Sequence, residues 1–144
     1  MDEKPMISTE DYYMGRQNSH ADELSSTMRE AAGMTVQRVN ALLLALDADQ
    51  IPQEINPKTG TIISSGWRPQ SINNATPGAA IRSKHLYCLA CDLFDPDGMI
   101  DNWCMEHQNK LAEIGLWLEH PSATKGWCHV QVVPPRSGNR VFYP

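Results

Sequence analysis

The sequence predicts a small α+β fold with an N-terminal helix, a small and mainly antiparallel sheet, and a second helix packed on that sheet. Apolar residues recur at helical spacing between residues 28 and 46, which indicates one long amphipathic helix. Short β-branched and apolar runs then alternate with turns rich in Pro and Gly, which is typical of short strands. With 144 residues, the chain has the length of one domain, and we assign 1–144 to it, with residues 1–24 as a polar lead-in.

The first helix is predicted over residues 27–49. Thr27 and Glu30 have the spacing of a capping box at its start. Its apolar face consists of Met28, Ala32, Val36, Val39, Leu43 and Leu46. A loop rich in Pro follows at 51–60, and "TIISSGW" at 61–67 predicts a short strand.

The remaining elements are shorter. Residues 69–84 predict a long loop, and the apolar run "HLYCLACDLF" at 85–94 predicts a buried strand. Asp101 is a candidate cap for a helix that ends at Ile114. Two strands ("GLWLEH", then "WCHVQVV") and a last turn with a short strand complete the prediction.

Composition and charge exclude several classes of protein. A net charge of −5 without a basic stripe argues against nucleic-acid binding. No apolar run reaches membrane-spanning length, and the first residues lack the pattern of a secretory signal. We therefore expect a protein that has no membrane span and that is made in a cytoplasm without a signal peptide. Since no heptad repeat is present, we also expect a monomer.

The four cysteines allow more than one interpretation. Cys88 and Cys91 form a CxxC pair, which occurs in redox sites and in zinc sites. Cys104 and Cys128 are 24 residues apart, unlike the two close pairs of a four-Cys zinc site. Packing of reduced thiols is the favoured interpretation, and the metal and redox roles stay open.

A candidate metal site comes from His85, Asp92 and His129. His85 and Asp92 are seven positions apart, so a helix would separate them by about 10 Å and a flat strand would point them to opposite faces. Both can reach one ion only if the chain turns between them. His129 begins another predicted strand and offers a third donor. Two imidazoles and one carboxylate match a catalytic zinc site with a fourth position for water.

These motifs resemble the M15 family of zinc peptidases. "SKHLYCLACD" is similar to the family's Ser-x-His-x(6)-Asp pattern, "GWCHVQ" to its aromatic-x-His strand, and "SSGWRPQ" to its Ser-Gly-aromatic-Arg element. The resemblance spans roughly residues 24–144 and implies a hedgehog and D,D-peptidase-like fold. It also implies that His85, Asp92 and His129 bind zinc.

The resemblance further implies roles for residues around the metal. Arg68 would bind a substrate carbonyl or carboxylate, or else be a surface residue beside a turn. Ser83 would contact the substrate or simply form a turn. Gln131, two residues after His129 on the same strand face, would support the metal site without binding the metal itself. Trp127 would line the substrate groove or pack in the core. Asn73 and Asn74 are expected to be loop formers.

The general base departs from the family pattern. Many members carry a Glu three residues before the last ligand, but this chain has Gly126 there. Glu119, at the end of the strand expected beside that of His129, is the first candidate, and a solvated strand-end carboxylate is the alternative. His120 is the second candidate.

The function expected from this resemblance is hydrolysis of peptide bonds in bacterial peptidoglycan stems by a zinc metallopeptidase. It would be a phage-type endolysin or a D,D-carboxypeptidase, made in the bacterial cytoplasm and acting in the periplasm or cell wall if it is a lysin. The alternatives are a non-catalytic zinc-binding module and a phage structural or assembly protein with the same fold.

Overall fold

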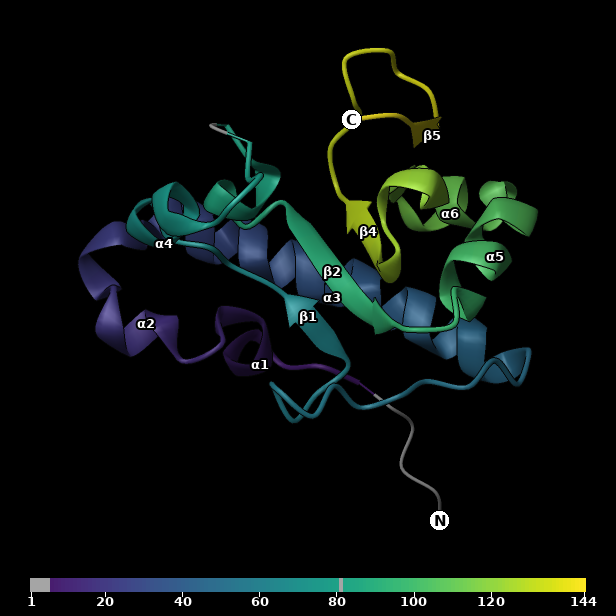
Figure 1. Ribbon diagram of the computed structural model, residues 1–144, viewed down its shortest axis with the longest axis horizontal. Helices are drawn as coiled ribbons and strands as arrows, with labels where there is room; N and C mark the ends of the chain where they lie inside the picture. The colour runs from purple at the N-terminus through teal and green to yellow at the C-terminus, as the bar shows by residue number, and fades with distance from the viewer. Residues whose placement is uncertain (1–5, 81) are drawn as a thin grey trace.

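The computed structural model describes residues 6–80 and 82–144 and has the predicted α+β class (Figure 1). A five-stranded sheet lies beside one long helix, α3, which crosses behind it in Figure 1. The α-helices of the described residues are α1 (Thr9–Tyr13), α2 (Arg16–Ser19), α3 (Ser26–Ala48), α4 (Gln70–Ala75), α5 (Met99–Glu106) and α6 (Gln108–Ile114). Three short 3₁₀ helices are η1 (Ala21–Glu23), η2 (Lys84–Tyr87) and η3 (Pro121–Ala123).

The sheet is mainly antiparallel, as predicted, and has the strand order β1-β2-β4-β3-β5. One neighbouring pair, β3 with β5, is parallel. The bounds are β1 (Ile63–Ser65), β2 (Ala90–Asp95), β3 (Trp117–Glu119), β4 (Gly126–Gln131) and β5 (Val141–Phe142). The long pair β2–β4 lies inside the sheet, with β1 beside β2 and β3 beside β4.

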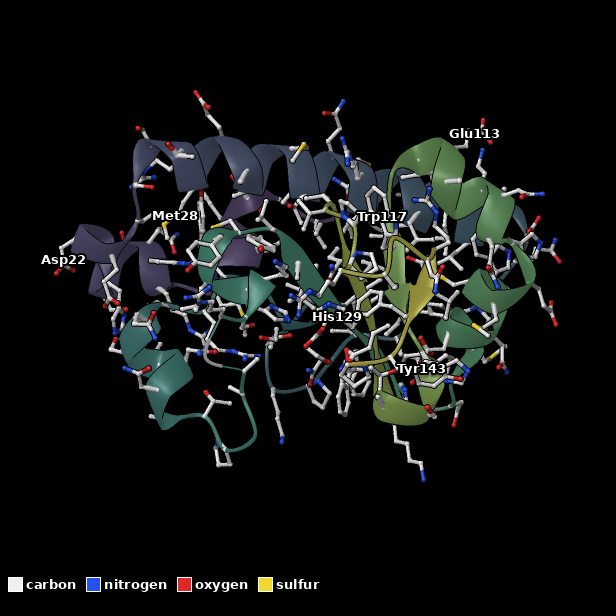
Figure 2. All side chains as sticks on the ribbon, turned by 90° about the horizontal axis from the view of Figure 1, so that it is seen from above. Asp22, Met28, Glu113, Trp117, His129 and Tyr143 are labelled. Atoms are coloured by element: carbon white, nitrogen blue, oxygen red, sulfur yellow. The ribbon has the colours of Figure 1, made fainter. Side chains whose placement is uncertain are left out.

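One face of the sheet is apolar and the other carries polar groups. Side chains alternate between the faces along each strand, and Leu93 and Val130 belong to the buried core that includes α3. Asp92 and His129, one position away from them, therefore point to the opposite face. Figure 2 shows α3 along one side of the molecule and His129 away from it.

Helix α3 confirms the predicted apolar face but begins at a different cap. Of the residues predicted on that face, Ala32, Val36, Val39, Leu43 and Leu46 are buried. The predicted box of Thr27 and Glu30 is wrong, because the hydroxyl of Ser25 accepts the hydrogen bond from the backbone N–H of Met28 at 3.1 Å.

The predicted polar lead-in, residues 1–24, contains helices in its described part, and residues 1–5 lie outside the described residues. Residues 6–24 include α1 and α2, and a capping box of Ser8 and Asp11 starts α1. Tyr12 is fully buried, and its hydroxyl donates to the carbonyl of Ala90 at 2.7 Å. The segment therefore packs against β2 through a contact that local sequence patterns do not reveal.

Two further boundaries differ from the prediction. Part of the predicted loop at 69–84 is helical, as α4. The predicted helix from Asp101 to Ile114 is broken at His107 into α5 and α6. Asp95, and not Asp101, satisfies the start of α5, because its two carboxylate oxygens accept from the backbone N–H groups of Ile100 and Asp101.

Asp101 is itself buried, which makes the stability of the fold depend on pH. Burial raises the pKa of Asp101 to about 6, although the hydroxyl of Thr124 donates to its Oδ2 at 3.0 Å. An unfolded Asp has a pKa of about 3.9, so the stabilising effect of its proton is complete below about pH 4 and is lost as pH rises through about 6. We expect Asp101→Asn, which resembles the protonated form, to be about 1 kcal/mol more stable than the wild type at pH 7.5 and equal to it near pH 4. Urea unfolding of both proteins at these pH values tests this, and a difference that does not change with pH contradicts it.

Candidate metal centre

The chain turns sharply between His85 and Asp92, as a shared ion requires. His85 lies in η2, where its backbone N–H donates to the hydroxyl of Ser83 at 3.2 Å. Cys88 ends that 3₁₀ helix in the left-handed conformation, with φ of 61°. Strand β2 begins only at Ala90, so the strand predicted over 85–94 is wrong for its first five residues. A short helix and a left-handed residue thus bring His85 back over the strand.

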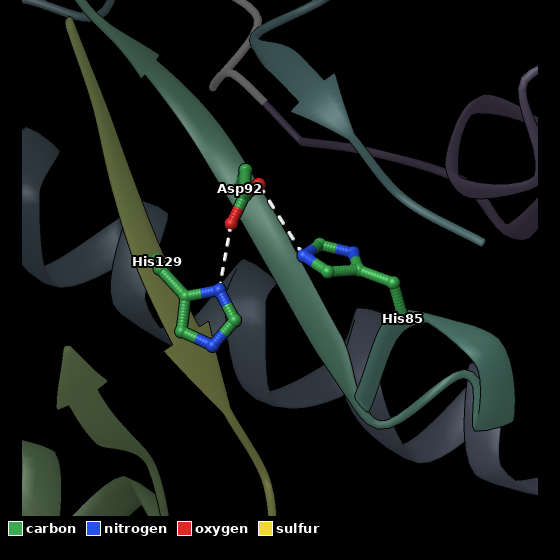
Figure 3. Close-up of side chains that lie close together, drawn as sticks. All are labelled: His85, Asp92 and His129. Atoms are coloured by element: carbon green, nitrogen blue, oxygen red, sulfur yellow. Dashed lines mark hydrogen bonds and ion pairs between the residues drawn. The ribbon is translucent and has the colours of Figure 1, made fainter. Parts of the chain in front are cut away.

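Three buried side chains meet on the polar face of the sheet (Figure 3). Asp92 on β2 lies directly opposite His129 on β4. Nε2 of His85 lies 3.3 Å from Oδ2 of Asp92, and Nδ1 of His129 lies 2.8 Å from Oδ1. Ligand atoms of the three residues all lie within 4.8 Å of one another, and no other such group occurs among residues 6–80 and 82–144. This group could hold a metal ion.

The second ring nitrogen of each histidine is held by an oxygen. Nδ1 of His85 lies 2.8 Å from the carbonyl oxygen of Gly66, which can only accept a hydrogen bond. Nε2 of His129 lies 3.0 Å from Oε1 of Gln131, whose amide nitrogen donates to the carbonyl of Val133. Each histidine therefore donates away from the site. When the rings are neutral, Nε2 of His85 and Nδ1 of His129 keep lone pairs for a cation, and when protonated the same nitrogens donate to Asp92 instead. Such outer hydrogen bonds are characteristic of histidines that bind metals.

The electrostatics of the group favour positive charge between its members. Burial alone would raise the pKa of Asp92, but the charge of His85 and the hydrogen bond from His129 outweigh it and hold that pKa below its usual range. Burial alone would lower the pKa of His129, but the hydrogen bond to Asp92 outweighs it and raises that pKa. A carboxylate that faces two imidazole nitrogens needs either protons or a cation between them, so metal binding at this site competes with protons.

Glu119 lies beside the three residues without joining them. Its Oε2 is 4.0 Å from Nδ1 of His129, and its side chain is 17% exposed. Burial raises the pKa of Glu119, and the charge of His129 offsets this in part. The carboxylate is thus next to the candidate ligands and still open to solvent. Gly126, where the family pattern has Glu, begins β4 with φ of 99°, a conformation that favours glycine.

His120 makes local contacts instead. Its ring stacks on Tyr143 with centroids 4.5 Å apart, and its Nδ1 accepts from the backbone N–H of Ser122 at the start of η3. It is not a member of the group of mutually close donor atoms.

Arg68 lies next to His85, and neutral groups accept the hydrogen bonds of its guanidinium. Its backbone N–H donates to the carbonyl of His85 at 3.1 Å, and its guanidinium donates to the side chains of Ser65 and Asn73, at 3.2 Å each. Ser65 pairs with Asp92 across β1 and β2. In the described part of the chain, no carboxylate oxygen lies within 4.0 Å of this guanidinium. Its charge is therefore available to an anionic ligand.

The other predicted site residues have the following positions. Ser83 caps η2 and so acts at least as a turn former. Trp127 is partly buried on the strand that carries His129 and Gln131. Asn73, expected to be only a loop former, is buried and orients Arg68, a role that was missed because α4 was not predicted.

The cysteines are free, buried thiols that pack in the core. Burial raises the pKa of Cys88 to about 12, which opposes formation of a reactive thiolate. Cys128 is next to His129 on β4 and so points away from the polar face, into the core.

Comparison with protein-family models, with curated proteins and with solved structures found no match to this chain. Within residues 6–80 and 82–144, no helix has the length and apolar character needed to cross a membrane.

Proposed function

We propose that this protein is a zinc-dependent peptidase that hydrolyses peptide bonds in bacterial peptidoglycan stems, as a phage-type endolysin or a carboxypeptidase. The observation that carries the proposal is the convergence of Nε2 of His85, Asp92 and Nδ1 of His129, each histidine being oriented by an outer acceptor. Two nitrogens and one carboxylate form a donor set that suits zinc. The order of the motifs along the chain, which resembles that of M15 peptidases, supports the peptidase assignment.

The residues around the three ligands have complementary chemistry. Zinc, when bound, supplies a Lewis acid and lowers the pKa of water. Glu119, next to His129, would take the proton from the attacking water and pass it to the leaving amine. Arg68 would bind a carbonyl or carboxylate of the substrate through its planar guanidinium. Gln131 and Gly66 would keep the two imidazoles oriented during the reaction.

The peptidase would be made in the bacterial cytoplasm and act in the periplasm or cell wall.

One observation favours a second candidate, a zinc-binding module or phage assembly protein without catalysis. The position three before His129 holds Gly126, so the base would have to come from Glu119, which lies on a different strand.

The test is the loss of turbidity of purified peptidoglycan treated with the full chain, together with mass analysis of the released muropeptides. We expect about one zinc per chain, hydrolysis that stops with a chelator, and recovery on addition of zinc. A chain that binds one zinc and releases nothing contradicts the peptidase and supports the non-catalytic module. A folded chain that binds no zinc contradicts the peptidase and the zinc-binding module and leaves the assembly protein.

A further inference from the structure

Residues 66–68, which follow β1, form a bridge between the N-terminal helices and His85. Gly66 and Trp67 share the first peptide unit of this bridge. Its carbonyl oxygen lies 2.8 Å from Nδ1 of His85, and its N–H donates to the carbonyl of Tyr12 at 2.9 Å. The C=O and N–H groups of a trans peptide are coplanar and point in opposite directions. The bond to Tyr12 therefore fixes the direction of the carbonyl that orients the ring of His85.

The second peptide unit of the bridge, between Trp67 and Arg68, has the same arrangement. Its carbonyl accepts from the guanidinium of Arg16 at 2.8 Å, and its N–H donates to the backbone carbonyl of His85 at 3.1 Å. Each unit thus binds the N-terminal segment on one side and His85 on the other. Both the ring and the backbone of His85 are held by this bridge.

Helix α1 fixes the bridge in place. Met14, which ends α1, accepts from the backbone N–H of Gly66 through its Sδ at 3.2 Å. A Cβ at position 66 would clash with the carbonyl oxygen of Tyr12, so only glycine allows this close approach. The hydroxyl of Tyr12 donates to the carbonyl of Ala90, which begins the strand of Asp92. Helix α1 is therefore bound both to the bridge and to the strand that carries a second candidate ligand.

The side chain of Arg16 is not engaged by an ion pair. In the described part of the chain, no carboxylate oxygen lies within 4.0 Å of its guanidinium. Because its donor is charged, its hydrogen bond to Trp67 is stronger than a bond between neutral groups. Arg16 also lies before the part of the chain, roughly 24–144, that resembles peptidases, so the resemblance gives it no role.

We propose that Arg16 is a positioning residue for His85, and that the N-terminal helices thereby belong to the metal centre. The inference rests on one part of the proposed function, the binding of a metal, and does not need the peptidase reaction. Without Arg16, the carbonyl of Trp67 loses its charged donor, and the bridge and the ring of His85 gain freedom to move. A ring that must be ordered when the metal binds gives a weaker site.

The first measurement is the affinity of the full chain for zinc, obtained by competition with a chromophoric chelator. For Arg16→Met we expect a loss of about three- to tenfold, which is smaller than the loss of about 10- to 100-fold typical of a direct outer partner. Arg16→Lys keeps a cationic donor and is expected to stay within about twofold of the wild type.

Arg38→Met is the matched control. The guanidinium of Arg38 also donates to backbone carbonyls, those of Gly115 and Val132, and not to the bridge. Its loss is expected to lower the free energy of unfolding and to leave the affinity for zinc within about twofold of the wild type. The control thus separates a general loss of stability from a loss of position at His85.

The second measurement needs no metal. The proton on Nδ1 of His85 is observed by NMR in the metal-free chain, and its rate of exchange with water is measured. Each opening of the bridge exposes this proton, so we expect its exchange to be about three- to tenfold faster in Arg16→Met and unchanged in Arg38→Met. Backbone N–H groups of α3 give the rate of global opening for comparison.

The outcome for Arg16 can be separated from that for the proposed function. Wild-type zinc affinity in Arg16→Met, wild-type exchange at His85 in that variant, or an equal loss of affinity in Arg38→Met overturns the inference. A chain that binds no zinc contradicts the proposed function, and the exchange at His85 then decides alone whether Arg16 positions the ring. Weaker zinc binding by Arg16→Met in a chain that hydrolyses no peptidoglycan supports the inference and contradicts the peptidase.

Discussion

His129→Ala is expected to lower the affinity for zinc more than about a hundredfold, which exceeds the loss typical of an outer hydrogen-bond partner. The substitution removes one of three donor atoms and leaves Asp92 buried with His85 as its remaining histidine partner. Gln131→Ala removes only the acceptor that orients the ring, so its loss of affinity is expected to be about 10- to 100-fold. The graded order of wild type, Gln131→Ala and His129→Ala is the specific expectation.

Competition with a chromophoric chelator measures these affinities, and zinc content after dialysis gives the stoichiometry. His20→Ala is the matched control, because His20 hydrogen-bonds its neighbour Ser19 far along the chain from the site. Thermal unfolding gives a second measurement. Zinc at about 100 times its dissociation constant stabilises the wild type by about 2.7 kcal/mol, and at the same zinc concentration this gain falls below about 0.4 kcal/mol in His129→Ala. Unchanged affinity in His129→Ala would show that its Nδ1 does not bind the metal.

The fold class follows from patterns that are local in sequence. The apolar face of α3 was predicted from its helical period, and β2 and β4 were predicted from short apolar runs. Helix α1 was not predicted, because its main anchor is the bond from Tyr12 to Ala90, 78 residues away. Helix α4 was not predicted, because the Pro, Asn and Gly content of its segment is typical of loops.

The candidate site was predicted to the level of residues but not of atoms. The spacing of His85 and Asp92 required a turn, and Cys88 in the left-handed conformation provides it. Which nitrogen of each ring faces Asp92 depends on the carbonyl of Gly66 and the amide of Gln131. Gly66 approaches Tyr12 so closely that a Cβ at position 66 would lie 2.0 Å from the carbonyl oxygen of Tyr12. Such contacts depend on how distant segments pack, which no sequence period encodes.

Glu119→Gln is expected to lower kcat/KM for a defined muropeptide by about 10²- to 10⁴-fold while zinc content stays at the wild-type level. Gln has nearly the same shape as Glu but cannot accept a proton from water. Because Oε2 of Glu119 lies 4.0 Å from Nδ1 of His129 and outside the group of candidate ligands, the substitution should remove proton transfer without removing the metal.

His120→Ala is the matched variant, since His120 lies next in sequence but stacks on Tyr143 and caps η3. We expect it to reduce kcat/KM by less than about tenfold, through the loss of local packing alone. Full activity in Glu119→Gln together with a large loss in His120→Ala would transfer the role of base to the histidine. Full activity in both variants would exclude both as the base, since neither proton acceptor would then be needed for hydrolysis.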